Sequence, residues 1–144
     1  MKRVSATVFA LALGILIPAA GMAQETDIQT AKKIFPTMTE AIHLFADRVD
    51  SLSTPEEFIQ ATTEYARTVE EFGKEEVRLL KEHQEWFDET PAELSDVLTA
   101  YREAMSRYDP AVQAVTRYAN DHSQHEGCQE AMQRLATALY EKFR

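Results

Sequence analysis

The feature that most constrains this chain is the stretch from Thr54 to Glu89, in which Pro55 is the one proline. Large apolar side chains recur along it at the spacing of a helix face. They are Phe58, Tyr65, Val69, Phe72, Val77, Leu80 and Phe87. Thr54 can cap such a helix, Pro55 suits its first position, and Glu57 can complete a capping box. The sequence therefore predicts one long helix from Pro55 to Asp88, against which the other helices pack.

A second apolar stripe precedes this stretch. Its members alternate between spacings of three and four residues: Ile28, Ala31, Phe35, Met38, Ile42, Phe45, Val49 and Leu52. Because the stripe keeps its phase across Pro36, we expect either a kinked helix or a short lead-in abutting a helix that starts near Pro36. The short connection Ser53-Thr54 predicts that the two helices pack antiparallel.

Two later positions repeat the pattern of a cap followed by proline. Thr90-Pro91 is predicted to start a shorter helix, and Asp109-Pro110 is predicted to start a new helical segment with Asp109 as its cap. Ser123 with Glu126 can cap a last helix, and the pattern leaves open whether residues 110–143 form one bent helix or two. Since no strand alternation occurs, the predicted fold is all-α: an antiparallel four-helix or five-helix up-and-down bundle behind a signal peptide.

The first residues have the order of a secretory signal peptide. Lys2 and Arg3 precede an apolar run from Val4 to Ile17, and small residues follow up to Ala23. This run is shorter than the roughly 20 residues of a membrane-spanning helix. We expect cleavage near Ala23, no stable membrane anchor afterwards, and one helical-bundle domain at residues 24–144. The form is typical of bacterial signals, so the predicted location is the periplasm, with secretion as the alternative.

The net charge limits the classes of binding partner, and the cysteine content bears on what stabilises the fold. The chain carries a net charge of −9, and loss of Lys2 and Arg3 makes the exported domain more acidic still. Such a surface repels nucleic-acid phosphates and anionic lipid, so neither is an expected partner. Cys128 is the one cysteine. The fold is therefore expected to depend on packing, without an internal disulfide.

No catalytic motif is recognisable. The sequence has four glycines, too few for a phosphate-binding loop, and no serine nucleophile elbow. Glu40 and His43 form the one Glu-x-x-His pair, and both lie off the apolar stripe, which argues against a di-iron centre. We therefore expect a protein that is not an enzyme.

One cluster suits a metal ion. His122, His125 and Cys128 follow one another at intervals of three, and Glu126 lies four residues after His122. On a helix these spacings gather side chains on one side, and imidazole with thiolate suits zinc or copper. The alternative is a polar helix junction in which Cys128 packs as a small apolar residue.

The overall layout resembles the small periplasmic b-type cytochromes that hold haem in a four-helix bundle. Met38 lies on the first core stripe, as the methionine ligand does in that family, and the chain ends Ala138-Leu139-Tyr140-Glu141-Lys142-Phe143-Arg144, similar to its closing helix. The resemblance implies a histidine ligand where this chain has Tyr140. No Cys-x-x-Cys-His is present, so covalent haem attachment is excluded.

The leading functional hypothesis is an exported, acidic, non-enzymatic bundle that binds a protein partner or small ligand along its long helix, without a cofactor. The alternative is a periplasmic protein that binds zinc, copper or haem. The apolar stripe of the long helix slides onto Gly73 and Val77, which indicates a change of packing neighbour. A groove is therefore expected around Gly73, Glu76 and His83.

Overall fold

The computed structural model describes the backbone of residues 2–144 and the side chains of residues 24–144. Its four α-helices are α1 (Lys2–Asp50), α2 (Pro55–Glu82), α3 (Ser95–Asp121) and α4 (Glu126–Glu141). Two short 3-10 helices, η1 (Gln84–Phe87) and η2 (Ala92–Leu94), lie between α2 and α3, and no strand occurs in the described chain. The predicted all-α fold with four helices is confirmed. The predicted signal peptide, residues 1–23, lies outside the described side chains.

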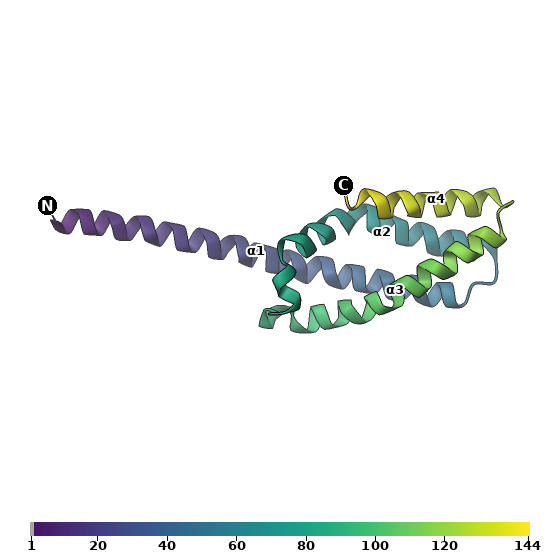
Figure 1. The fold of residues 1–144 in the computed structure, drawn as a ribbon, viewed down its shortest axis with the longest axis horizontal. Helices are drawn as coiled ribbons and strands as arrows, with labels where there is room; N and C mark the ends of the chain where they lie inside the picture. Colours follow the sequence, from purple (N-terminus) through teal and green to yellow (C-terminus); the bar gives the residue numbers. More distant parts are fainter. Residues whose placement is uncertain (1) are drawn as a thin grey trace.

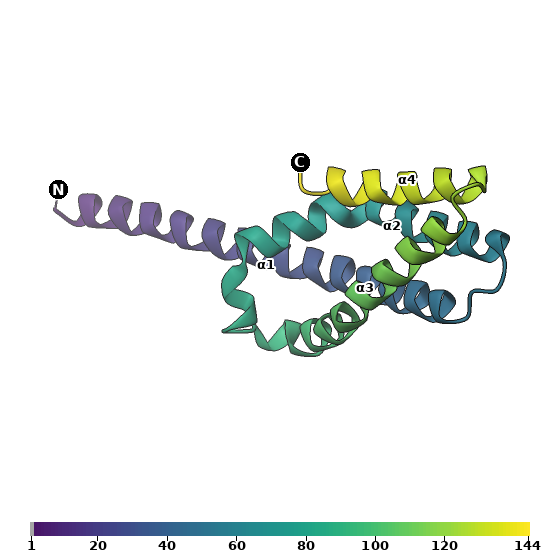
Figure 2. The ribbon, with the colours of Figure 1, turned by 45° about the vertical axis from the view of Figure 1, so that its right-hand side comes forward.

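Successive helices alternate in direction, and the first part of α1 projects beyond the bundle (Figure 1). The closest helix neighbours are α1 with α3, α2 with α4, and α1 with α2, while α3 and α4 approach each other less. Two neighbouring pairs, α1 with α3 and α2 with α4, consequently run parallel. This differs from a simple up-and-down bundle, whose neighbours are all antiparallel. Figure 2 shows how the connection from α2 to α3 crosses one end of the bundle.

The predicted apolar stripes form the core. Phe35, Met38 and Ile42 of α1 are almost completely buried. Three aromatic pairs join helices across the interior: Phe35 with Tyr101, Phe45 with Tyr65, and Phe58 with Tyr118. Burying a large apolar side chain contributes about 1.5–3 kcal/mol, so these stripes dominate the stability of the bundle. Within residues 24–144, no helix is long and apolar enough to cross a membrane.

The start of α2 is as predicted, and its end is not. Thr54 caps the helix, since its hydroxyl accepts a hydrogen bond from the backbone N–H of Glu57 at 3.2 Å. Glu57 reaches back to the N–H of Ser53 at 2.9 Å, one residue before the cap. The helix ends at Glu82 and not at Asp88. His83 leaves the helical conformation, and the following turn buries Trp86, which offsets the helical hydrogen bonds that are lost.

Prolines inside a stripe do not break the helices. α1 continues through Pro36, so a separate lead-in helix was the wrong alternative. α3 continues through Pro110, and the predicted restart at Asp109 is also wrong. Pro110 cannot donate a backbone hydrogen bond. Ala111 and Val115 are buried beyond it, and continued burial of this stripe outweighs one missing hydrogen bond of about 1 kcal/mol.

Two predicted caps are replaced by other residues. The hydroxyl of Thr90 donates to the carbonyl of Trp86 at 2.6 Å and caps no helix, because α3 begins only at Ser95 after η2. α4 is capped by His125, whose Nδ1 accepts from the backbone N–H of Cys128 at 3.2 Å, and not by Ser123. Residues 110–143 thus belong to two helices separated at 122–125.

Candidate functional site

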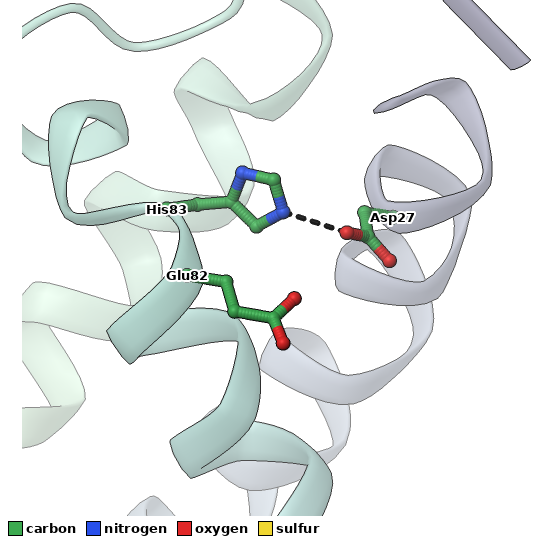
Figure 3. Close-up of side chains that lie close together, drawn as sticks. All are labelled: Asp27, Glu82 and His83. Atoms are coloured by element: carbon green, nitrogen blue, oxygen red, sulfur yellow. Dashed lines mark hydrogen bonds and ion pairs between the residues drawn. The ribbon is translucent and has the colours of Figure 1, made fainter. Parts of the chain in front are cut away.

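Three side chains with metal-binding atoms meet where α2 ends beside α1 (Figure 3). Asp27 comes from α1, Glu82 is the last residue of α2, and His83 follows it. Each offers one ligand atom, and these atoms lie within 4.8 Å of one another. Among the described residues, no other group of three or more histidine, cysteine or carboxylate side chains is gathered this closely.

The end of α2 fixes the imidazole of His83. The backbone N–H of Trp86 donates to the carbonyl of His83 at 3.0 Å, which closes the turn of η1. The imidazole stacks on the indole of Trp86, with ring centroids 3.9 Å apart and planes 8° from parallel. Because Trp86 is buried in the core, this stacking holds the histidine ring in one orientation.

Two carboxylates contact this imidazole from opposite ring nitrogens. Nε2 of His83 lies 2.7 Å from Oδ2 of Asp27, and Nδ1 lies 3.3 Å from Oε1 of Glu85. Because a carboxylate oxygen can only accept, the hydrogen of the 2.7 Å contact lies on Nε2, which donates to Asp27. This bond links Asp27 to the end of α2.

Arg78 orients both carboxylates of the group. Its guanidinium donates to Oδ1 of Asp27 at 3.0 Å and to Oε2 of Glu82 at 2.7 Å, and it also contacts Glu75. Hydrogen bonds from Arg78 and then from His83 lower the pKa of Asp27. Asp27 is therefore a carboxylate at neutral pH. Arg78 occupies one oxygen of Asp27 and one of Glu82, and the second oxygen of Asp27 lies 2.7 Å from Nε2 of His83.

The sequence-predicted metal residues take local roles at the other end of the bundle. His122 stacks on Tyr118 with centroids 4.0 Å apart, and its Nδ1 lies 2.9 Å from the Tyr118 carbonyl oxygen. His125 caps α4, and Cys128 is fully buried, where desolvation raises the pKa of its thiol. His122, His125, Glu126 and Cys128 are not gathered at ligand spacing in the described structure. A zinc or copper site on these four residues stays a prediction.

The two positions named by the cytochrome resemblance face different surroundings. Met38 is completely buried in the core, whereas Tyr140 is 66% exposed. Haem binding stays an alternative that the resemblance implies, beside the expectation of no cofactor.

The structure places a close neighbour at Gly73, while the predicted change of packing neighbour along α2 stays a prediction. Gly73 is buried, and a Cβ added there would lie 3.0 Å from Cβ of Lys142. Glu76 is also buried, and it accepts hydrogen bonds from the Tyr101 hydroxyl at 2.8 Å and from Nζ of Lys142 at 3.1 Å. The expected groove at this point is thus filled by Lys142.

A concave surface lies instead between α1 and α2, and we call it the α1–α2 groove. Its central hollow has a volume of about 100 Å³ and is lined by Ala41, Leu44, Phe45, Arg48, Ala61, Glu64, Tyr65 and Thr68. Two further hollows adjoin it. One shares Glu64 with the central hollow, the other shares Arg48 with it, and the two share Gln60, so the three hollows form one surface. Leu44 stands at its edge with 45% of its surface exposed.

No protein family matches this sequence, and neither curated proteins nor solved structures give a match. The fold and the two sites are therefore interpreted from their own geometry.

Sequence reasoning placed His83 near a groove but missed Asp27 and Glu82. The antiparallel hairpin supplies a signal that could have found them. Asp27 lies about as far before the Ser53-Thr54 turn as His83 lies after it. Residues equidistant from the turn of a helical hairpin face each other, so the end of α2 meets α1 at Asp27.

Proposed function

We propose that this protein is an exported, acidic, non-enzymatic helical bundle that binds a protein partner or a small ligand in the α1–α2 groove. The supporting observation is the exposed side chain of Leu44 beside a hollow with an apolar floor. That floor contains Phe45, Ala61 and Tyr65. The proposed location is the periplasm, as the form of the signal peptide indicates.

The lining of the groove has the composition of a binding site. An apolar floor with a few polar groups at the edge is typical of ligand pockets and of the centres of protein interfaces. Here the edge carries the Arg48–Glu64 ion pair and Gln60. The groove also extends along α2, the helix that was expected to present the binding face.

Crosslinking from defined positions tests this proposal. A photoreactive amino acid at Leu44 should yield one defined adduct in cells that export the protein, and the adduct should weaken when Ile59 is changed to glutamate. The matched control is the same photoreactive residue at Met105 of α3, which is 36% exposed and lies outside the groove. Equal adducts from both positions, or none from Leu44 together with no small molecule in the purified protein, would overturn the proposal.

A further inference from the structure

We propose that Asp27, Glu82 and His83 form a binding site for a divalent transition-metal ion, best suited to Zn²⁺. The ligands would be Nε2 of His83 and one carboxylate oxygen each from Asp27 and Glu82. Water would complete a tetrahedral set. This site lies at the end of the bundle that the connection from α2 to α3 crosses, which we call the crossing end. It is separate from the α1–α2 groove.

The spacing of the three ligand atoms fits a single ion. Zinc binds imidazole nitrogen and carboxylate oxygen at about 2.0–2.2 Å, so atoms on one ion lie about 3–3.5 Å from each other. The three atoms here lie within 4.8 Å of one another, and Nε2 of His83 is already 2.7 Å from Asp27. Small side-chain rotations therefore suffice to reach the bonding distances.

The surroundings of His83 are those of a metal-bound histidine. Such residues usually donate the second ring N–H to a carboxylate, which fixes the tautomer and leaves the other nitrogen for the ion. Glu85 is placed for this role, with Oε1 3.3 Å from Nδ1 of His83. The stack on Trp86 holds the ring plane, so little side-chain freedom is lost when an ion binds.

Arg78 supports the site without neutralising it. It holds Oδ1 of Asp27 and Oε2 of Glu82, and the other oxygen of each carboxylate accepts no hydrogen bond from Arg78, with that of Asp27 beside His83. The carboxylates that contact Arg78 or His83 are those of Asp27, Glu75, Glu82 and Glu85. Their combined charge exceeds that of one guanidinium, and the field at the site therefore favours a cation.

An ion at this position would link segments that are far apart in the chain. Asp27 is near the start of the described side chains, and His83 begins the connection that crosses the end of the bundle. Because binding to the folded state stabilises that state, Zn²⁺ should raise the melting temperature. It should also protect the connection from proteolysis.

Calorimetric titration of the metal-free purified protein with Zn²⁺ tests the proposal. We expect one ion per chain, and affinity reduced more than about tenfold in both His83→Ala and Glu82→Gln. Glu82 has an exposed side chain, so its variant should keep the fold even if His83→Ala loosens the turn. The control His122→Ala/His125→Ala should bind as the wild type does.

Three results would overturn this site. The first is a wild-type protein without stoichiometric binding. The second is wild-type affinity in a folded Glu82→Gln variant. The third is loss of binding in the His122→Ala/His125→Ala control, which would assign the ion to the other end of the bundle.

Discussion

The two ends of the bundle use histidine in different ways. One end holds the short α1–α2 and α3–α4 connections, and we call it the turn end. There, His122 and His125 contact residues three or four positions away in the chain. At the crossing end, His83 contacts Asp27, which is 56 residues away. The histidines of the turn end make local contacts, whereas His83 also meets a side chain that only the tertiary fold brings close.

This difference teaches that residues close in sequence need not have their ligand atoms gathered in the fold. His122 and His125 have ligand-like spacing, but they lie at the break between α3 and α4. There, His122 stacks on Tyr118 and His125 caps α4. His83 stands alone in the sequence, yet helix packing surrounds it with carboxylates. A local pattern found the cap at Thr54, whereas the register of the whole helical hairpin is needed to find the group around His83.

The largest expected effect concerns Lys142 at the crossing end. Lys142→Met would leave the buried carboxylate of Glu76 with Tyr101 as its one remaining hydrogen-bond donor. Removing one partner of a buried ion pair costs about 3–5 kcal/mol. Urea unfolding followed by circular dichroism should show this loss of stability.

Arg144→Met is the matched control in the same terminal segment. Its pair with Glu141 is exposed, and such pairs contribute less than about 1 kcal/mol. In the double variant Glu76→Gln/Lys142→Met, part of the lost stability should return, because no unpaired charge remains buried. Equal losses in Lys142→Met and Arg144→Met would contradict the view that long-range contacts dominate at this end.

Two glycine substitutions give a comparison of intermediate size. In Gly73→Ala the new Cβ would lie 3.0 Å from Cβ of Lys142, an atom that the backbone of Lys142 holds in place. In Gly127→Ala it would lie 2.9 Å from Cδ1 of Ile59, the flexible end of a side chain. We expect Gly73→Ala to lose about 1 kcal/mol despite its better helix propensity.

Gly127→Ala should stay within about 0.5 kcal/mol of the wild type, because Ile59 can adjust its rotamer. Thermal unfolding of both variants gives the measurement. If Gly73→Ala were the more stable protein of the two, Lys142 would not approach α2 as closely as the structure shows.

Much of the fold could be predicted from periodicity. The stripes of α1 and α2 and the cap at Thr54 depend on residues a few positions apart, and each is confirmed. The end of α2 and the continuity of α3 through Pro110 could not be predicted. Both are decided by burial, of Trp86 in one case and of Val115 in the other, which outweighs the local signals of proline and threonine.

At the turn end, the expected effect of a single substitution is smaller. Thr54→Ala removes the side-chain oxygen that accepts from Glu57, and loss of such a cap costs about 1 kcal/mol. Thr99→Ala is a suitable control, since its hydroxyl bonds within an exposed turn of α3. Chemical denaturation should separate the two variants, and equal stability would mean that the cap does not contribute in solution.

The smallest expected effect is a dependence of stability on pH. A hydrogen bond from Arg48 lowers the pKa of Glu64, and hydrogen bonds from Ser53 lower that of Glu57. Since both groups have a lower pKa when folded, their contribution is present above the unfolded pKa and is lost as pH falls through the folded value. The melting temperature should therefore drop between about pH 5 and about pH 3.

That decline should be shallower in the variant Glu57→Gln/Glu64→Gln than in the wild type. Both groups lie near the α1–α2 turn, so the pH dependence reports on the cap of α2 and on the Arg48–Glu64 ion pair. An identical decline in both proteins would place the acid-sensitive groups elsewhere.

The central claim is that tertiary packing, and not sequence spacing, prepares a histidine for a ligand. Nitrogen NMR of the four imidazoles during titration with Zn²⁺ tests it directly, because a ring nitrogen that binds the ion shifts strongly. We predict that Nε2 of His83 shifts with one equivalent of Zn²⁺ while His122 and His125 keep their signals. Shifts at His122 or His125, with His83 unchanged, would contradict the account.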